Sequence, residues 1–239
     1  MPFTRPRHWL RWLTGGIAVL AVLAVAGPFL YIHFFNGSAP AALSLSPSGS
    51  TSASASASAA TAASGPVAGN WTVGSGSVVG YRVNEVLLGQ NATAVGRSSS
   101  VTGHLTIAGS TATAASFSVA MDTIHSDKSQ RDGQFDGRIM DVTQYPTATF
   151  TLTSPVDLAP LPAAGAVKTY TTHGQLTLHG TTRAVTVALT AERTGSQIKV
   201  SGNIPVLFSD YNIQNPSFAG FVTTQDHGLL EFLLVFSRS

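Results

Sequence analysis

Apolar and polar residues alternate with a period of two through much of the chain. The clearest segments are 78–83, 101–107, 115–121, 148–152, 174–178, 185–191 and 198–200. Because successive side chains of a β-strand point to opposite faces of a sheet, this period is typical of strands with one buried and one solvated face. The segments are separated by turn sequences such as HGTTR and RTGSQ, and no long helical pattern intervenes. The pattern therefore predicts an antiparallel β-sandwich or barrel.

Two segments depart from this alternation. The stretch LLEFLLVF, residues 229–236, is apolar on both faces except at Glu231, which predicts a strand whose outer face is covered by another element. The stretch SDKSQRDGQFDGRI, residues 126–139, places Phe135 and Ile139 at helical i, i+4 spacing. We expect a short docked helix there, with its charges in water, and we expect this helix to provide the cover.

A third pattern occupies the N-terminus. Residues 13–35 are almost uncharged and as a helix would extend about 34 Å, enough to span a bilayer. The arginines at positions 5, 7 and 11 all precede this run, which predicts a cytoplasmic N-terminus (1–12), a transmembrane helix (13–35) and an exported remainder in a bacterial cell envelope. The alternative is a signal peptide cleaved after Ala24-Val25-Ala26, which would give a secreted protein.

Residues 36–69 are small and uncharged, and they predict a disordered linker. Residues 70–239 then form one globular domain, long enough for a single core. The chain has 13 basic and 11 acidic residues, and three of the basic residues are the N-terminal arginines, so the domain itself is slightly acidic. Without a basic stripe, nucleic-acid binding is not expected.

The sequence offers little to support catalysis. The absence of cysteine excludes disulfides, thiolate metal sites and cysteine nucleophiles, and no GxSxG motif is present. His125 beside Asp122 and Asp127 fits a solvated start of the helical segment better than a metal site. Arg131 and Asp132 in that segment are candidates for an ion pair that pins the segment to a strand. We expect no catalytic residue, metal or cofactor.

Five stretches together resemble the YceI family of polyisoprenoid-binding, lipocalin-like proteins. They are IHSDKSQRD, MDVTQYPTATFTLTSP, HGQLTLHGTTRAVTV, FSDYNIQNPSFAGFV and DHGLLEFLLVFS, in that order between Trp71 and Ser237. The resemblance implies an all-β, eight-stranded antiparallel lipocalin-like barrel with a short helical insertion near 126–140, around an apolar tunnel that holds an isoprenoid chain. Residues 80–103 depart from the family, where many relatives carry a short histidine-containing strand.

Combined with the alternation, the resemblance gives candidate tunnel-lining residues, each with ordinary core packing as its alternative. They are Tyr81, Phe117, Phe150, Leu176, Val187, Phe208, Phe232 and Phe236. Arg82 and Glu85 are candidates for a polar site near a lipid head group, because alternation leaves Glu85 on the face of Tyr81, where it would need an arginine or tyrosine partner.

The expected partners are a polyisoprenoid or another long-chain lipid, and the membrane through the N-terminal helix. The oligomeric state is left open, with a homodimer as one option. Two other functions compete: a structural or interaction module with a filled barrel, and an enzyme that acts on isoprenoid lipids.

Overall fold

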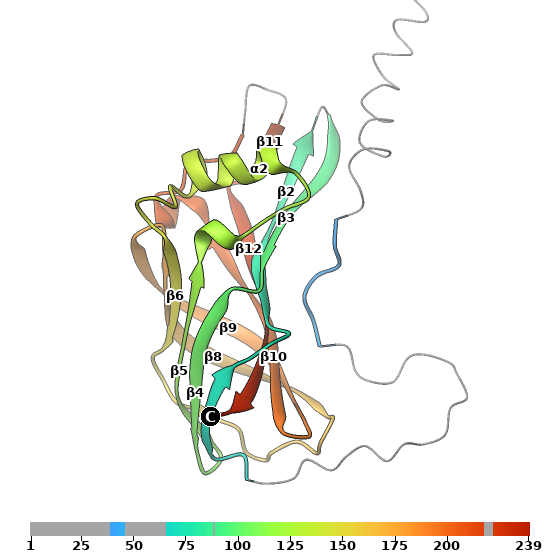
Figure 1. Ribbon diagram of the computed structural model, residues 1–239, viewed down its shortest axis with the longest axis vertical. Helices are drawn as coiled ribbons and strands as arrows, with labels where there is room; N and C mark the ends of the chain where they lie inside the picture. The colour runs from blue at the N-terminus through green and yellow to red at the C-terminus, as the bar shows by residue number, and fades with distance from the viewer. Residues whose placement is uncertain (1–38, 46–65, 88, 218–221) are drawn as a thin grey trace, which may run out of the picture.

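The structure, a computed structural model, describes residues 39–45, 66–87, 89–217 and 222–239 (Figure 1). The predicted transmembrane helix and most of the predicted linker lie outside these residues. Among the residues described, no helix combines the length and the apolar character needed to cross a bilayer.

One antiparallel sheet of twelve strands forms the body of the molecule. The strands are β1 (Gly69–Val73), β2 (Val78–Leu87), β3 (Gln90–Ser98), β4 (Val101–Ala108), β5 (Thr111–Ala120), β6 (Thr147–Leu152), β7 (Val156–Asp157), β8 (Val167–Leu178), β9 (Thr181–Thr194), β10 (Gln197–Leu207), β11 (Val222–Thr224) and β12 (His227–Arg238). Four short helical segments accompany them: η1 (Met121–Thr123), α2 (Ser129–Gln134), the π-helical η2 (Phe135–Ile139) and η3 (Phe208–Tyr211).

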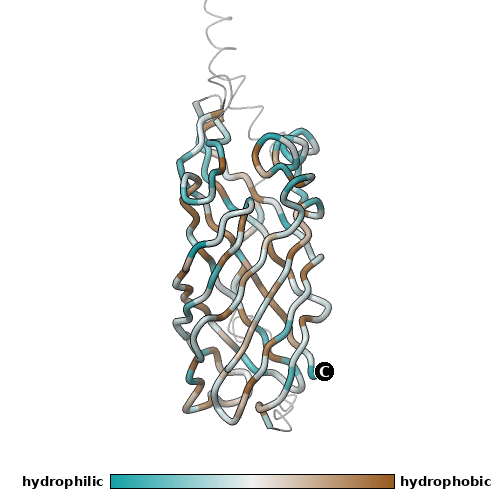
Figure 2. The backbone as a smooth tube through the Cα atoms, turned by 90° about the vertical axis from the view of Figure 1, so that its left-hand side faces the viewer, coloured by the Kyte–Doolittle hydropathy of each residue, from teal (hydrophilic) through white to brown (hydrophobic). Residues whose placement is uncertain are grey.

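The sheet closes on itself. Strands β1, β4, β5, β6, β8, β9, β10 and β12 follow one another in the pairing order, and pairing of β1 with β12 completes the ring. The prediction of an eight-stranded antiparallel barrel is therefore confirmed. Strand β2 pairs with β12 beyond the end of β1, and it also pairs with β3 and β11. Figure 2 shows the resulting elongated tube, with helical segments at one end.

Alternating burial confirms the period of two. In β8, Tyr170, Thr172, Gly174, Leu176 and Leu178 are buried, whereas the residues between them are exposed or partly exposed. Every second side chain of such a strand therefore points into the barrel, where it is removed from water.

The helical insertion is present, and its position differs from the prediction. Helices α2 and η2 lie across one end of the barrel (Figure 1), and Phe135 is buried with its ring stacked on Tyr81 at a centroid distance of 5.0 Å. The expected cover over the outer face of β12 is thus wrong, because the aromatic side chain of the insertion packs into the open barrel end instead.

The outer face of β12 is crossed by residues 39–45, which we call the strap. Arg82 on β2 donates a hydrogen bond from Nη2 to the Pro40 carbonyl at 2.7 Å, and Arg97 on β3 donates one to the Ala41 carbonyl. On the other side of β12, the Leu45 amide donates to Ser201 Oγ of β10 at 3.1 Å. The strap lies beside these strands in Figure 1, so the predicted disordered linker does not extend through these seven residues.

Candidate ligand-binding cavity

The end of the barrel beneath the helical insertion is filled. Phe135 and Met140 from the insertion pack with Phe208 and Tyr211 of η3, all buried, and Tyr81 of β2 packs against them. We call these five residues the plug. Burial raises the pKa of the Tyr81 phenol well above its usual range, so this hydroxyl stays neutral.

Below the plug the barrel is hollow. A cavity of about 530 Å³ is lined mainly by apolar side chains of β4, β5, β6, β8, β9, β10 and β12. Leu161 lines it and is 46% exposed, so the cavity reaches the surface beside the loop that precedes β8. Ala164 and Arg193 line the cavity near the same loop, since the Gly165 amide donates to the Arg193 carbonyl. We call this opening, formed by Leu161, Ala164 and Arg193, the mouth.

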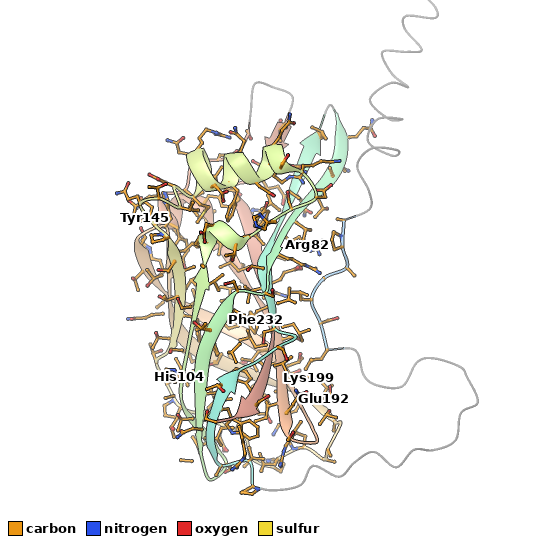
Figure 3. All side chains as sticks on the ribbon, in the orientation of Figure 1. Arg82, His104, Tyr145, Glu192, Lys199 and Phe232 are labelled. Atoms are coloured by element: carbon orange, nitrogen blue, oxygen red, sulfur yellow. The ribbon has the colours of Figure 1, made fainter. Side chains whose placement is uncertain are left out.

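Six of the eight predicted lining residues face this cavity: Phe117, Phe150, Leu176, Val187, Phe232 and Phe236. Figure 3 shows Phe232 inside the barrel. The other two, Tyr81 and Phe208, do not line it and belong to the plug. Tyr81 from β2 and Phe208 from η3 instead pack against Phe135 and Met140 of the docked insertion, which fills this part of the barrel.

Glycines keep the hollow part open by giving the phenylalanine rings room against the barrel wall. Phe117 lies opposite Gly103 and Phe232 opposite Gly202 in the strand register. A Cβ atom on either glycine would lie only 2.6 or 2.7 Å from the facing ring, and one on Gly174 would lie 2.3 Å from Phe150. Since these contacts are too short for a larger residue, glycine at these three positions leaves the space beside the wall that each ring occupies.

Comparison with known proteins decides the family. Residues 71–236 match the sequence profile of the YceI-like domain. The chain belongs to the YceI-like family. No curated protein shows significant sequence similarity to it.

Solved structures share the barrel of this YceI-like protein. A polyisoprenoid-binding domain from Saccharophagus degradans is 17% identical with a TM-score of 0.59, and the match covers 71% of this chain and 98% of that one. Burkholderia cenocepacia BcnA is 22% identical with a TM-score of 0.50, over 65% and 95% of the two chains. A Campylobacter jejuni YceI protein is 13% identical with a TM-score of 0.50, over 60% and 84%. At these identities the likeness shows the fold alone.

The predicted head-group residues of the YceI-like domain lie away from the cavity. Arg82 lies on the side of the strap (Figure 3). Its Nε donates to Glu231 Oε1 at 2.7 Å, and Arg97 Nη2 lies 3.4 Å from Glu231 Oε2. Glu85 is 3.2 Å from Arg131 Nη2 of the insertion. This contact is the ion pair predicted for Arg131, and it supplies the arginine partner predicted for Glu85.

A second, larger hollow of about 1050 Å³ lies between the strap, the β2–β3 hairpin and α2. Many polar and charged residues line it. Among them, Glu85 pairs with Arg131, and Arg97 pairs with Glu231. The β2–β3 hairpin occupies the region 80–103 that departs from the family pattern. This hollow therefore suits an apolar chain poorly.

The lining residues that were not predicted include Tyr170, Thr172 and Arg193. The signal for the first two was present, because Tyr170 and Thr172 continue the inward phase of Gly174, Leu176 and Leu178 toward the start of β8. Thr172 is 3% exposed, and its Oγ1 has no hydrogen-bond partner among the described residues.

Proposed function

We propose that this protein is a binding protein for a polyisoprenoid or a similar long-chain lipid, whose chain lies in the cavity between the plug and the mouth. The observation that carries this proposal is an apolar cavity of about 530 Å³ inside a barrel that its own side chains do not fill. Removal of apolar surface from water contributes about 25 cal/mol per Å², so a chain gains affinity with each carbon that enters. Membership of a family with a polyisoprenoid-binding relative supports the same ligand class.

We also propose that the domain is held outside the cytoplasm by the predicted membrane helix at 13–35, with a cleaved signal peptide as the alternative. The support is the uncharged 23-residue run preceded by arginines. An intact chain that resists extraction by high salt would support the anchor. A chain found in the medium and beginning near Gly27 would contradict it.

The test of ligand class is a titration of the delipidated protein with prenyl alcohols of increasing length. Affinity should rise with the number of isoprene units until the cavity is full and should then stay constant, because further units remain in water. Affinity that is indifferent to chain length, or that depends chiefly on a phosphate head group, would contradict the proposal. Native mass spectrometry of the purified protein adds a direct check, since a filled structural barrel carries no lipid mass.

Two variants localise the chain in the cavity. Phe150→Asp and Phe232→Asp should abolish uptake, because an unpaired carboxylate inside an apolar cavity is far more unfavourable than the lost ring contacts. Leu207→Asp is the matched control, since Leu207 is 40% exposed and does not line the cavity. Equal uptake by Phe232→Asp and Leu207→Asp, with both proteins folded, would place the ligand elsewhere.

A further inference from the structure

Thr172 places a hydroxyl group inside the apolar cavity. It lies on the inward face of β8 between Tyr170, which is nearer the mouth, and Leu176, which is nearer the plug. Its partner across the strand pair is Val187, which is 2% exposed and offers no polar atom. The hydroxyl is buried, and it lacks a hydrogen-bond partner among the described residues.

Other polar groups of this wall are already engaged or distant. The Tyr170 hydroxyl lies 3.4 Å from the Leu158 carbonyl. Arg193 supplies the cation among the described lining residues, but it is six residues beyond Val187 on β9, or about 20 Å along the strand. A group that contacts Thr172 therefore does not reach this guanidinium.

A buried polar group without a partner is unfavourable, and a hydrocarbon chain that covers Thr172 would leave its hydroxyl unpaired. An anionic group at this depth would be buried without a cation, which is more unfavourable still. The group that satisfies both conditions is a neutral oxygen, such as that of an alcohol or a carbonyl.

We propose that Thr172 is a hydrogen-bonding residue of the cavity that selects long-chain ligands carrying a neutral alcohol or carbonyl oxygen over pure hydrocarbons. The oxygen lies at the depth of Thr172, and the apolar tail extends from it toward the plug between Phe117, Phe150 and Phe232. This inference rests on the proposed function, because it requires that a chain occupies the cavity.

The test is a competition between two probes of equal carbon number, a prenyl alcohol and the corresponding prenyl hydrocarbon, on the full chain. Native mass spectrometry measures the ratio of alcohol-bound to hydrocarbon-bound protein. Because both probes partition into the membrane mimetic to the same extent in every sample, differences in this ratio between variants arise from the protein. One hydrogen bond should favour the alcohol by about three- to tenfold in the wild type at the chain length that places the oxygen beside Thr172. Thr172→Val, which keeps the shape and removes the hydroxyl, should reduce this ratio to one or below, because the hydroxyl of the alcohol is then buried without a partner. Thr172→Ser should retain the preference for the alcohol.

Thr171→Val is the matched control, because it makes the same change one residue away on the exposed face of β8. It should keep the wild-type ratio, and Thr172→Ala provides a second variant without the hydroxyl if the valine variant does not fold. A wild-type ratio in both hydroxyl-free variants, with chains still bound, would overturn the role of Thr172 and leave the proposed function intact. Failure of the wild type to bind either probe at any chain length would overturn both.

Discussion

Tyr145 covers the turn between β8 and β9. Its ring meets the His179 ring edge-on at a centroid distance of 4.5 Å, and it lies so close to Gly180 that an added Cβ would be 2.4 Å from the ring. Gly180 also has a φ of +70°, in the left-handed region that side chains other than glycine rarely adopt. The turn thus requires glycine both for its backbone conformation and for the contact with Tyr145.

Gly180→Ala should therefore destabilise the domain more than Gly195→Ala. Gly195 has a similar φ of +58° but no atom within 4 Å of the added Cβ, so alanine there pays only the backbone cost of about 1–2 kcal/mol. At position 180 the displacement of Tyr145 should add about 1–3 kcal/mol. Urea denaturation of the two variants measures the difference, and equal losses of stability would show that Tyr145 yields without cost.

At the scale of the element, the helical insertion depends on docking for its stability. Helix α2 has only six residues, its N-cap residue Lys128 makes no side-chain capping bond, and helices this short are not stable alone in water. Two contacts hold it: Phe135 in the plug, and Arg131 with Glu85. Burial lowers the pKa of the Arg131 guanidinium, and the carboxylates of Glu85 and Asp127 raise it by more, so the arginine remains charged.

Arg131→Met should loosen the insertion, because it leaves the half-buried Glu85 carboxylate unpaired at a cost of about 1–3 kcal/mol. Replacing both residues, by Arg131→Met with Glu85→Leu, should recover most of that stability. Arg138→Met is the control within the same insertion, since the Arg138 side chain is bonded at the surface to Gln134 and Pro216. Hydrogen exchange of the α2 amides and thermal unfolding compare the stability of the three variants. An Arg138→Met variant that is destabilised as much as Arg131→Met would contradict the role of the Arg131–Glu85 pair.

The strands could be predicted from the sequence because a period of two is a local property, and β6 begins at Thr147, directly after Pro146. The ion pair of Arg131 could also be predicted, since a buried carboxylate in a strand needs a cation. The division of the barrel into plug and cavity could not be predicted from the sequence. It depends on where Phe135 docks, and on a strand register that sets Gly103 against Phe117 and Gly202 against Phe232. Thr172 is not among the predicted lining residues, although it continues the inward phase of Gly174 and Leu176 on β8.

At the scale of the whole molecule, the strap joins the barrel wall to the chain that precedes it. Its carbonyl groups accept hydrogen bonds from Arg82 and Arg97, whose guanidinium groups also contact the buried Glu231 carboxylate. Hydrogen bonds to charged groups contribute about 1.5–3 kcal/mol each. A glycine–serine replacement of the strap keeps the backbone carbonyls but loses more conformational entropy on docking than the native sequence with Pro40, so water competes for these bonds and we expect a smaller loss of about 1–2 kcal/mol.

The same replacement should change how the barrel lies on a membrane. Because the chain contains no cysteine, a single cysteine at position 195, near the mouth, can carry a fluorophore without competing labels. In full-length protein reconstituted in bilayers, energy transfer to labelled lipid should be weaker for the wild type than for the strap replacement. Identical transfer in the two proteins would mean that the strap does not orient the barrel.

With the membrane helix proposed above, the strap limits how far the barrel can move from the bilayer. Ala39 and Pro40 lie beside α2, at the plugged end, whereas the chain enters β1 at Gly69 near Val67, which lines the cavity toward the mouth. With the proposed membrane helix ending at residue 35, a docked strap leaves about 14 Å of chain to the bilayer and turns the mouth away from it. When the strap is undocked, the extended chain between the membrane helix and the barrel can reach about 110 Å, and it joins the barrel at the mouth end. One short segment thereby distinguishes a barrel that presents its mouth to the space beyond the membrane from one whose mouth can return to the lipid surface.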